Sequence, residues 1–308
     1  MASVKLSDMM KKRQLLSFEL FPPKTDRGMA NLSETIQQLC RYKPEYISVT
    51  YGAGGGNVGA NREVCRMVRN AGTVPVTHFT VIRNTKQGIR EQLETYLKEG
   101  VDHILALRGD FPRGETSTGG DFNYATDLVK FIRDEFGEQF EIAVAGSPEG
   151  HISCRSLEAD IGVLKMKQDN GADYIMTQLC WDMEQFERWL DKIRRAGVTL
   201  PEGVGIMPIL DQAATINMAL SRNGCVMDRE LSRLISKYWI FPNPFDKAPF
   251  DDSLEQKKAD FKKAGIEYTI RQIDKYRSLG VEGIHLYAMN KWKDVSQIIE
   301  RSGIRTLI

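Results

Sequence analysis

Short apolar runs alternate along the chain with longer stretches whose apolar residues recur at helical spacing. The short runs predict strands, whereas the longer stretches predict amphipathic helices. Eight strands are expected, at residues 16–21, 46–50, 74–76, 103–107, 142–145, 174–176, 204–207 and 283–287. Helices are expected at residues 31–41, 62–70, 86–99, 124–136, 157–170 and 184–196. Strands and helices therefore alternate through most of the chain.

A glycine stands between most of the helical stretches and the strand that follows. These glycines are Gly72, Gly100, Gly137, Gly171, Gly197 and Gly280. Glycine readily adopts the left-handed backbone conformation that ends many helices, so each one marks a helix C-terminus. A strand followed by a helix takes about 30 residues, which matches this spacing. Eight such units in a chain of 308 residues favour an α/β fold of the (βα)8 TIM-barrel type over an open sheet.

The interval between Gly197 and Gly280 is much longer than the others. It holds two further helical stretches, at 228–238 and 253–278, separated by a segment at 241–249 with three prolines that cannot be helical. We interpret this material as extra helices between strands seven and eight. The chain, residues 1–308, is therefore predicted to be a single catalytic barrel domain rather than two domains.

Charge and cysteine content narrow the class of protein. The chain has 42 Lys and Arg against 41 Asp and Glu, so its overall charge does not indicate a nucleic-acid partner. No apolar run approaches the roughly 20 residues of a membrane span, and the polar first residues lack the apolar core of a signal peptide. The five cysteines are scattered without a C-x-x-C pair. These features predict a cytoplasmic protein with reduced thiols.

Polar residues gather where the predicted strands end. In a barrel of this type the active site lies at the C-terminal ends of the strands, so we expect these side chains to share one site. They are Glu19, Thr50, His78, Arg108, Asp110, Ser147, His151, Gln178, Tyr287 and Lys291. Buried polar groups are costly unless they are paired, which makes a purely structural explanation of all of them difficult.

Glu19 alternates with Phe18 and Leu20, so its side chain points to the opposite face of the strand. If the two apolar neighbours pack against helices, Glu19 faces the barrel mouth. Partial desolvation there would raise the pKa of its carboxyl and suit it to general acid catalysis. An ion pair with a lysine or arginine of the barrel is an equally good interpretation of the spacing.

Other motifs argue against a dinucleotide-binding fingerprint and against a metal site. Residues 54–59 match G-x-G-x-x-G, but no acidic residue ends the next strand, so a dinucleotide fingerprint is incomplete and a glycine-rich ligand loop is expected. The histidines show no H-x-H or H-E-x-x-H spacing, so no metal site is predicted. His103 begins its strand at the far end of the barrel and is expected to be structural.

A series of motifs resembles 5,10-methylenetetrahydrofolate reductase. The matching runs are SFELFPPK at 17–24, SVTYGAG at 48–54, ALRGD at 106–110, GAD leading to TQ at 171–178, GIMP at 205–208 and GIHLY at 283–287. They occur in order from about Leu16 to the C-terminus. No counterpart of the C-terminal regulatory domain of the eukaryotic enzymes follows, so the resemblance is to the short bacterial form that contains only the catalytic domain.

The resemblance implies a barrel that binds FAD and reduces 5,10-methylenetetrahydrofolate to 5-methyltetrahydrofolate, in one-carbon metabolism and methionine supply. Electrons reach the flavin from NADH or NADPH, which leaves before the folate enters the same face. Family members are commonly oligomeric, so a homo-oligomer is expected. Some relatives use a redox partner subunit, which is the alternative source of electrons.

Individual roles also follow from the resemblance. Glu19 matches the general acid that opens the five-membered folate ring, and Asp110 matches a carboxylate beside the flavin pyrimidine edge that also contacts the pterin. Gln178, Tyr287 and Lys291 match positions on the substrate side, where Lys291 replaces an arginine of some relatives. The positions expected to bind FAD are Thr50, His78, Arg108, Gly109, Asp110, Ala125, Asp127, Ser147, His151, Asp160 and Lys167.

Two departures concern substrate stacking. Residues 210–212 stand where relatives often carry an aromatic residue, and Ser147 stands where some carry a tyrosine. Two other functions share parts of this pattern. One is another FAD-dependent barrel oxidoreductase similar to proline dehydrogenase, which would lack the Glu19 acid. The other is a flavin-free barrel that binds folate or transfers methyl groups as a partner subunit.

Overall fold

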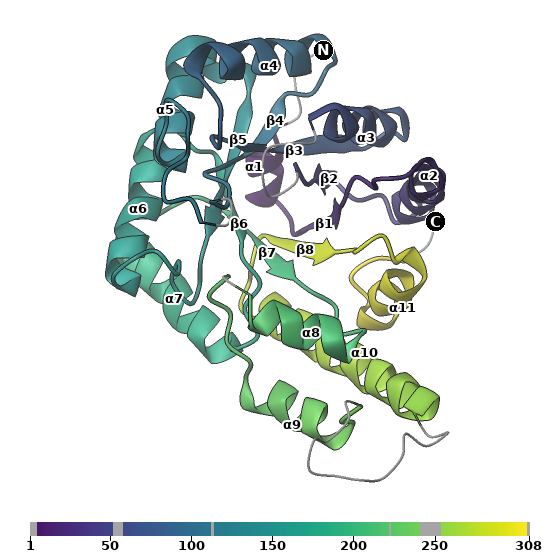
Figure 1. Cartoon of the computed structure of the whole chain (residues 1–308). Helices are drawn as coiled ribbons and strands as arrows, with labels where there is room; N and C mark the ends of the chain where they lie inside the picture. The colour runs from purple at the N-terminus through teal and green to yellow at the C-terminus, as the bar shows by residue number, and fades with distance from the viewer. Residues whose placement is uncertain (1–4, 52–57, 112–113, 222, 241–253, 307–308) are drawn as a thin grey trace.

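The fold is seen in a computed structural model, which describes residues 5–51, 58–111, 114–221, 223–240 and 254–306. Eight parallel strands form a closed barrel in sequence order, with β1 paired to both β2 and β8 (Figure 1). The strands are β1 (Leu15–Leu20), β2 (Tyr46–Val49), β3 (Val74–Thr80), β4 (His103–Leu107), β5 (Glu141–Gly146), β6 (Tyr174–Thr177), β7 (Glu202–Ile206) and β8 (Gly283–Tyr287). The predicted (βα)8 TIM barrel is confirmed.

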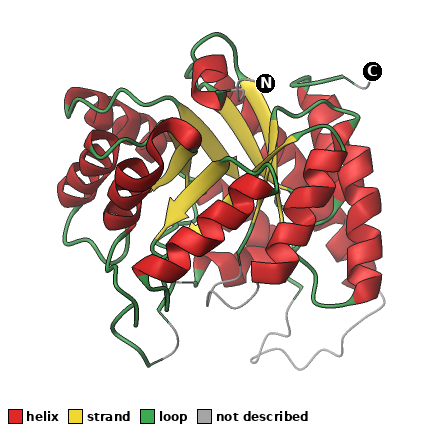
Figure 2. Cartoon of the chain, turned by 90° about the horizontal axis from the view of Figure 1, so that it is seen from above, coloured by secondary structure: helices red, strands yellow, loops and turns green. Residues whose placement is uncertain are grey.

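Helices surround the barrel on its outside (Figures 1 and 2). Those that follow the first six strands are α2 (Asp26–Cys40), α3 (Val58–Asn70), α4 (Lys86–Lys98), α5 (Ala125–Phe136), α6 (Leu157–Asp169) and α7 (Met183–Arg195). A short 3-10 turn, η1 (Gly137–Gln139), follows α5, and α11 (Trp292–Ser302) closes the ring after β8. No described helix is both long and apolar enough to cross a membrane.

Three helices lie between β7 and β8: α8 (Gln212–Ala219), α9 (Arg229–Lys237) and α10 (Leu254–Ser278). The two predicted stretches, at 228–238 and 253–278, correspond to α9 and α10, whereas α8 was not expected from the sequence. Leu231 and Ile235 of α9 share an apolar cluster with Phe261 of α10 and with Trp181, which follows β6. The added helices are thus packed onto the barrel. The proline-containing segment at 241–249 and most of the glycine-rich segment at 54–59 lie outside the described residues.

The predicted helix-ending glycines all have the expected backbone. Each has a positive φ, between 56° and 103°, at Gly72, Gly100, Gly137, Gly171, Gly197 and Gly280. A side chain is strained in this region, so the sequence pattern reports the backbone conformation directly.

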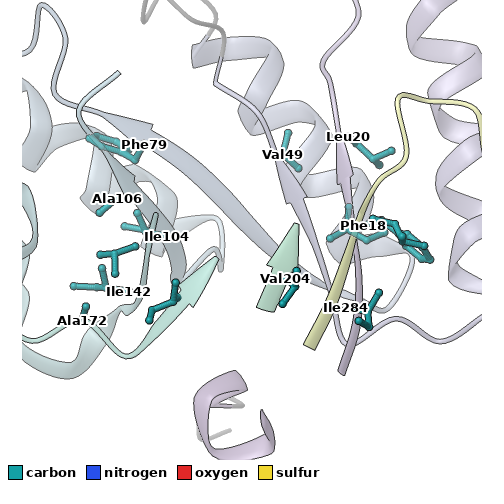
Figure 3. Packing of buried hydrophobic residues seen from close by; sticks show 14 of the residues in the cluster. Phe18, Leu20, Val49, Phe79, Ile104, Ala106, Ile142, Ala172, Val204 and Ile284 are labelled. Carbon is teal, nitrogen blue, oxygen red and sulfur yellow. The ribbon is translucent and has the colours of Figure 1, made fainter. Parts of the chain in front are cut away.

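The barrel wall is apolar on its outer side. Phe18 and Leu20 are fully buried (Figure 3). They share one core cluster with Leu32 and Ile36 of α2. Because side chains alternate along a strand, Glu19 points to the interior of the barrel. The predicted orientation of Glu19 is therefore confirmed.

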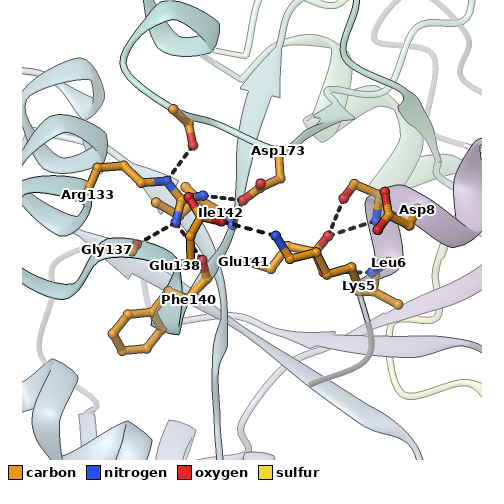
Figure 4. A network of polar contacts seen from close by, with 12 residues as sticks. Lys5, Leu6, Asp8, Arg133, Gly137, Glu138, Phe140, Glu141, Ile142 and Asp173 are labelled. Carbon is orange, nitrogen blue, oxygen red and sulfur yellow. Dashed lines mark hydrogen bonds and ion pairs between the residues drawn. The ribbon is translucent and has the colours of Figure 1, made fainter. Parts of the chain in front are cut away.

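A short helix not expected from the sequence, α1 (Leu6–Met10), closes the end of the barrel opposite the site. Leu6 and Met10 pack into the barrel interior, and the backbone N–H groups of Leu6 and Ser7 donate to the Glu141 carboxylate at 2.7 and 2.8 Å (Figure 4). His103 Nε2 lies 3.1 Å from the same carboxylate. The predicted structural role of His103 is confirmed.

Candidate active site

The interior of the barrel near the C-terminal strand ends holds a carboxylate between two imidazoles. Oε2 of Glu19, on β1, lies 3.4 Å from Nε2 of His78 on β3 and 3.7 Å from Nε2 of His285 on β8. Glu19 and His78 are each 9% exposed, and His285 is 1% exposed. Strands β1 and β8 are neighbours in the closed barrel. Strand β3, which carries His78, is separated from β1 by β2.

His285 is held by its neighbours on both edges of the ring. Its Nδ1 lies 2.8 Å from the Ser17 hydroxyl, and its Nε2 lies 3.3 Å from the Ser48 hydroxyl. The Tyr46 ring stacks on the imidazole with centroids 5.7 Å apart. These contacts hold the ring in one orientation. Burial lowers the pKa of His285, with Glu19 opposing the shift, so the ring is neutral at pH 7.

Glu19 is ionised in this arrangement, contrary to the sequence-based expectation. Burial by itself would raise the pKa of the carboxyl, but the adjacent His285 and His78 outweigh it and lower the pKa to about 2. The expected raised pKa is therefore wrong for this arrangement. The expected alternative, a lysine or arginine partner, is also wrong, because the two nearest partners are histidines. The reason is that β3 and β8 each place an imidazole on the inner face at this level of the barrel.

Charged residues predicted to hold a flavin form a second group around β4, β5 and α6. Burial and the cations Arg108 and Lys167 lower the pKa of His151, while Asp160 and Asp110 oppose them, so these side chains lie close enough to affect one another. The Lys167 ammonium donates to the Ala145 carbonyl at 2.8 Å, and burial lowers its pKa. The structure thus brings a cation that follows β4, Arg108, and a cation of α6, Lys167, to the same group, as a site for a diphosphate requires.

The backbone after β4 packs closely against β3 and the loop that follows it. Gly109 has a φ of 86°, and a Cβ there would lie only 2.7 Å from the Ile82 side chain. The buried Thr80 hydroxyl beside it has no hydrogen-bond partner. An unsatisfied buried polar atom next to a bare backbone fits a polar ligand at this position. The donor set and the unsatisfied Thr80 hydroxyl together fit the FAD implied by the sequence.

The remaining predicted flavin residues flank this group. Ala125 and Asp127 start α5, where the Asp127 carboxylate accepts from the backbone N–H groups of Asn123 and Tyr124 at 3.1 and 3.0 Å. Asp127 therefore has a helix-capping role of its own. Thr50 directly follows β2, and its N–H donates to the Leu20 carbonyl at 3.0 Å.

Residues predicted on the substrate side meet between β6 and β8. The Tyr287 hydroxyl lies 3.5 Å from Oε1 of Gln178, and Ser147 lines the same narrow hollow as Gln178. Lys291 is exposed in the turn between β8 and α11, and Asp110 is exposed after β4. The described residues contain no group of three or more His, Cys, Asp or Glu side chains that could hold a metal ion.

Two residues were not assigned a role from the sequence. His285 was treated only as part of a motif, although alternation with Ile284 and Leu286 places it on the inner face beside Glu19. The other is Glu149, after β5, whose carboxylate accepts from the Val226 N–H at 3.0 Å and whose pKa burial raises to about 7. Glu149 stands in the polar run that follows the fifth predicted strand, but its contact with Val226, 77 residues away, could not be predicted from the sequence.

Comparison with known families agrees with this geometry. A family model described as methylenetetrahydrofolate reductase matches residues 5–235. The chain belongs to the methylenetetrahydrofolate reductase family. The 5,10-methylenetetrahydrofolate reductase of Escherichia coli is 30% identical over 291 residues, which cover 94% of this chain and 91% of that protein.

Longer members of the methylenetetrahydrofolate reductase family are also similar. Methylenetetrahydrofolate reductase 1 of Schizosaccharomyces pombe is 32% identical over 298 residues, covering 96% of this chain and 47% of that protein. The chain spans about half the length of this and several other curated relatives. A solved Clostridium thermocellum protein, described as binding two copies of 5-methyl-5,6,7,8-tetrahydrofolic acid, superposes with a TM-score of 0.60 at 12% identity, over 97% of this chain and 99% of that one. At that identity the likeness shows the shared fold alone.

Proposed function

We propose that this protein reduces 5,10-methylenetetrahydrofolate to 5-methyltetrahydrofolate, using bound FAD and taking hydride from NADH or NADPH in a ping-pong reaction. The observation that carries the proposal is the buried Glu19, held between two histidines at the mouth of a barrel of this family. The E. coli relative, which this chain covers almost completely, carries the name of that activity.

FAD, when bound, would supply the hydride that converts the methylene group to a methyl group. Arg108, His151 and Lys167 would hold its diphosphate, and Gly109, next to Arg108, would contact it through its backbone. The other proposed contacts are Thr50, His78, Asp110, Ala125, Asp127, Ser147 and Asp160. Asp110 lies beside this group, where its negative charge would disfavour the anionic form of a reduced flavin.

The folate would lie over the interior polar cluster. Gln178 and Tyr287 are already in contact and present an amide and a hydroxyl that can hydrogen-bond the pterin. Glu19 would deliver a proton to the nitrogen that leaves the methylene carbon. Lys291, exposed after β8, would meet the glutamate tail as a point charge.

Electron donor, assembly and location belong to the same proposal. Some relatives are named for NADH and one for NADPH, so either nicotinamide fits, with a redox partner subunit as the alternative donor. We expect a homo-oligomer. Five free, scattered thiols favour a reducing compartment, and we propose the cytoplasm.

Anaerobic stopped-flow spectroscopy of the purified, FAD-loaded protein tests the proposal. NADH or NADPH should bleach the flavin absorbance, and methylenetetrahydrofolate should restore it. A flavin that is bleached but not reoxidised by the folate would favour a different flavin-dependent barrel oxidoreductase. A protein that takes up no FAD but binds folate would favour the methyl-transfer alternative.

A further inference from the structure

The two histidines beside Glu19 differ in how free they are to exchange a proton. Both ring nitrogens of His285 face serine hydroxyls, and its ring is 1% exposed. Nε2 of His78 is buried, points at the Glu19 carboxylate from 3.4 Å and has no hydrogen-bond partner. The His78 side chain is nevertheless 11% exposed, compared with 1% for His285. The Glu19 side chain is also 11% exposed, so His78 and Glu19 both border the open end of the barrel, whereas His285 does not.

An ionised Glu19 cannot donate a proton until it receives one. The proposed reaction takes up one proton per turnover at the departing amine. Of the groups next to Glu19, the Ser17 and Ser48 hydroxyls have pKa values far too high to supply it. Burial raises the pKa of Tyr287 well above its ordinary value, and His285 is neutral. An imidazole at the site edge is the remaining donor that works near pH 7.

We infer that His78 is a proton relay that loads Glu19 from the barrel mouth, so that the acid of the reaction is the His78–Glu19 pair. The inference rests on the proposed function. Because an imidazole has two nitrogens, one facing Glu19 leaves the other for the predicted flavin contact. His285 is a positioning residue that holds the carboxylate from the opposite side.

The proton balance of the step is as follows. The N–H bond at Nε2 of protonated His78 breaks, and the proton moves to Oε2 of Glu19. The carboxyl then gives it to the folate amine while the bond from the methylene carbon to that amine breaks, and the electron pair of this bond stays on the amine nitrogen. The hydride of the proposed reaction completes the methyl group. Solvent at the mouth returns a proton to His78.

Three strands carry the titratable groups that surround His78. Glu19 comes from β1, Tyr46 from β2, and His285 and Tyr287 from β8, while the apolar Leu105 of β4 lies beside His78 in the sheet. Burial raises the pKa of Tyr46 beyond the neutral range. Arg108 and Asp110 follow β4 at the same end of the barrel. A fall in the rate of the folate half-reaction with rising pH across the imidazole range would therefore come from a histidine.

The test compares His78→Gln with His285→Gln, a matched change on the other side of the same carboxylate. In FAD-loaded protein, reoxidation of reduced flavin by methylenetetrahydrofolate is followed from about pH 5.5 to 9, across the ordinary imidazole range. In the unsubstituted protein this rate should fall as the pH rises and a histidine loses its proton, which gives the pH–rate profile a descending limb. His78→Gln should remove the limb and slow reoxidation about 100-fold more than it slows reduction by NADH. His285→Gln should keep the limb, and added imidazole should restore part of the rate in His78→Ala.

Two results would overturn the relay. One is a histidine limb that survives in His78→Gln, and the other is an equal loss in both half-reactions, which would mean that His78 only holds the flavin. An NMR titration of carboxyl-labelled Glu, assigned with Glu19→Gln, does not depend on turnover. His78→Gln should raise the pKa of Glu19, and an unchanged titration also refutes the relay. Failure of the unsubstituted protein to oxidise flavin with folate at any pH refutes the proposed function instead.

Discussion

Glu19 shows how much a single side chain depends on its neighbours. Its burial alone would favour the protonated carboxyl, whereas the two imidazoles stabilise the carboxylate and lower its pKa. Glu149 shows the opposite balance, since burial raises its pKa to about 7 and the Val226 N–H only partly compensates. The two carboxyls therefore differ in ionisation, and by pKa alone Glu149 would be the better acid near pH 7, whereas Glu19 is the one placed between the two imidazoles.

Replacing these two carboxyls separately distinguishes them. We expect Glu19→Gln to keep flavin reduction by NADH but to slow the folate half-reaction by about 100-fold or more, because the amide cannot deliver a proton. Stopped-flow measurement of both half-reactions checks this. Glu149→Gln is the matched control, since its amide oxygen still accepts from Val226, and it should leave the folate half-reaction within about threefold. The reverse order of effects would move the acid to Glu149.

At the scale of elements, α1 holds the closed end of the barrel through charge as well as packing. The Glu141 carboxylate, on β5, receives two backbone N–H groups and the Ser7 hydroxyl, and it lies against His103 of β4. Burial would lower the pKa of His103, but Asp102 and Glu141 outweigh it and raise the pKa from 6.5 to about 9. His103 therefore joins α1, β4 and β5 as a cation.

This contact predicts a loss of stability in alkali. Since the pKa of His103 is higher in the folded than in the unfolded chain, its stabilisation is fully present below pH 6.5 and disappears as the pH rises through about 9. The difference in unfolding free energy between the unsubstituted protein and His103→Gln should therefore shrink by on the order of 3 kcal/mol between these limits. Urea denaturation at a series of pH values measures it, and a constant difference would contradict a charged His103.

Helix α10 approaches the loop after β7 at a glycine. A Cβ on Gly265 would overlap the Ile209 carbonyl oxygen, so α10 can lie this close only with glycine there. Gly162 of α6 is an exposed helical glycine with nothing near its Cβ position. We expect Gly265→Ala to destabilise the protein by about 1–3 kcal/mol and Gly162→Ala to stabilise it by up to about 1 kcal/mol. Chemical denaturation measures both, and equal signs would contradict the close approach.

At the scale of the whole molecule, closure of the barrel joins the first strand to the last. Each strand has a partner on both sides, and β1 pairs with β8 along five residues, from Leu15 to Glu19. No strand can leave without exposing hydrogen-bonding edges on its two neighbours. The barrel should therefore behave as one cooperative unit, including the helices between β7 and β8.

Thermal unfolding tests whether the barrel and the helices between β7 and β8 unfold as one cooperative unit. The change in far-ultraviolet circular dichroism and the change in fluorescence of the buried Trp181 and Trp189 should coincide in one transition. Two separated transitions would contradict the predicted single domain.

The sequence alone determined the number of strands, their order and the inward direction of Glu19. These are local properties: alternation of side chains along a strand, helical spacing and glycines at helix ends all act within a few residues. The motifs also determined the family. Helix α1 was missed because it is five residues long, and its stability comes from Glu141 rather than from its own sequence.

Only the tertiary structure determined which side chains contact Glu19. His78 and His285 are far from it in the chain, and they reach it because the barrel closes with a register that puts β3 and β8 side chains at its level. The pKa of a buried carboxyl is set by the partners within a few ångströms, so the expected direction was wrong even though the residue was correctly chosen. A sequence specifies which face a side chain occupies, but ionisation depends on contacts made between distant strands.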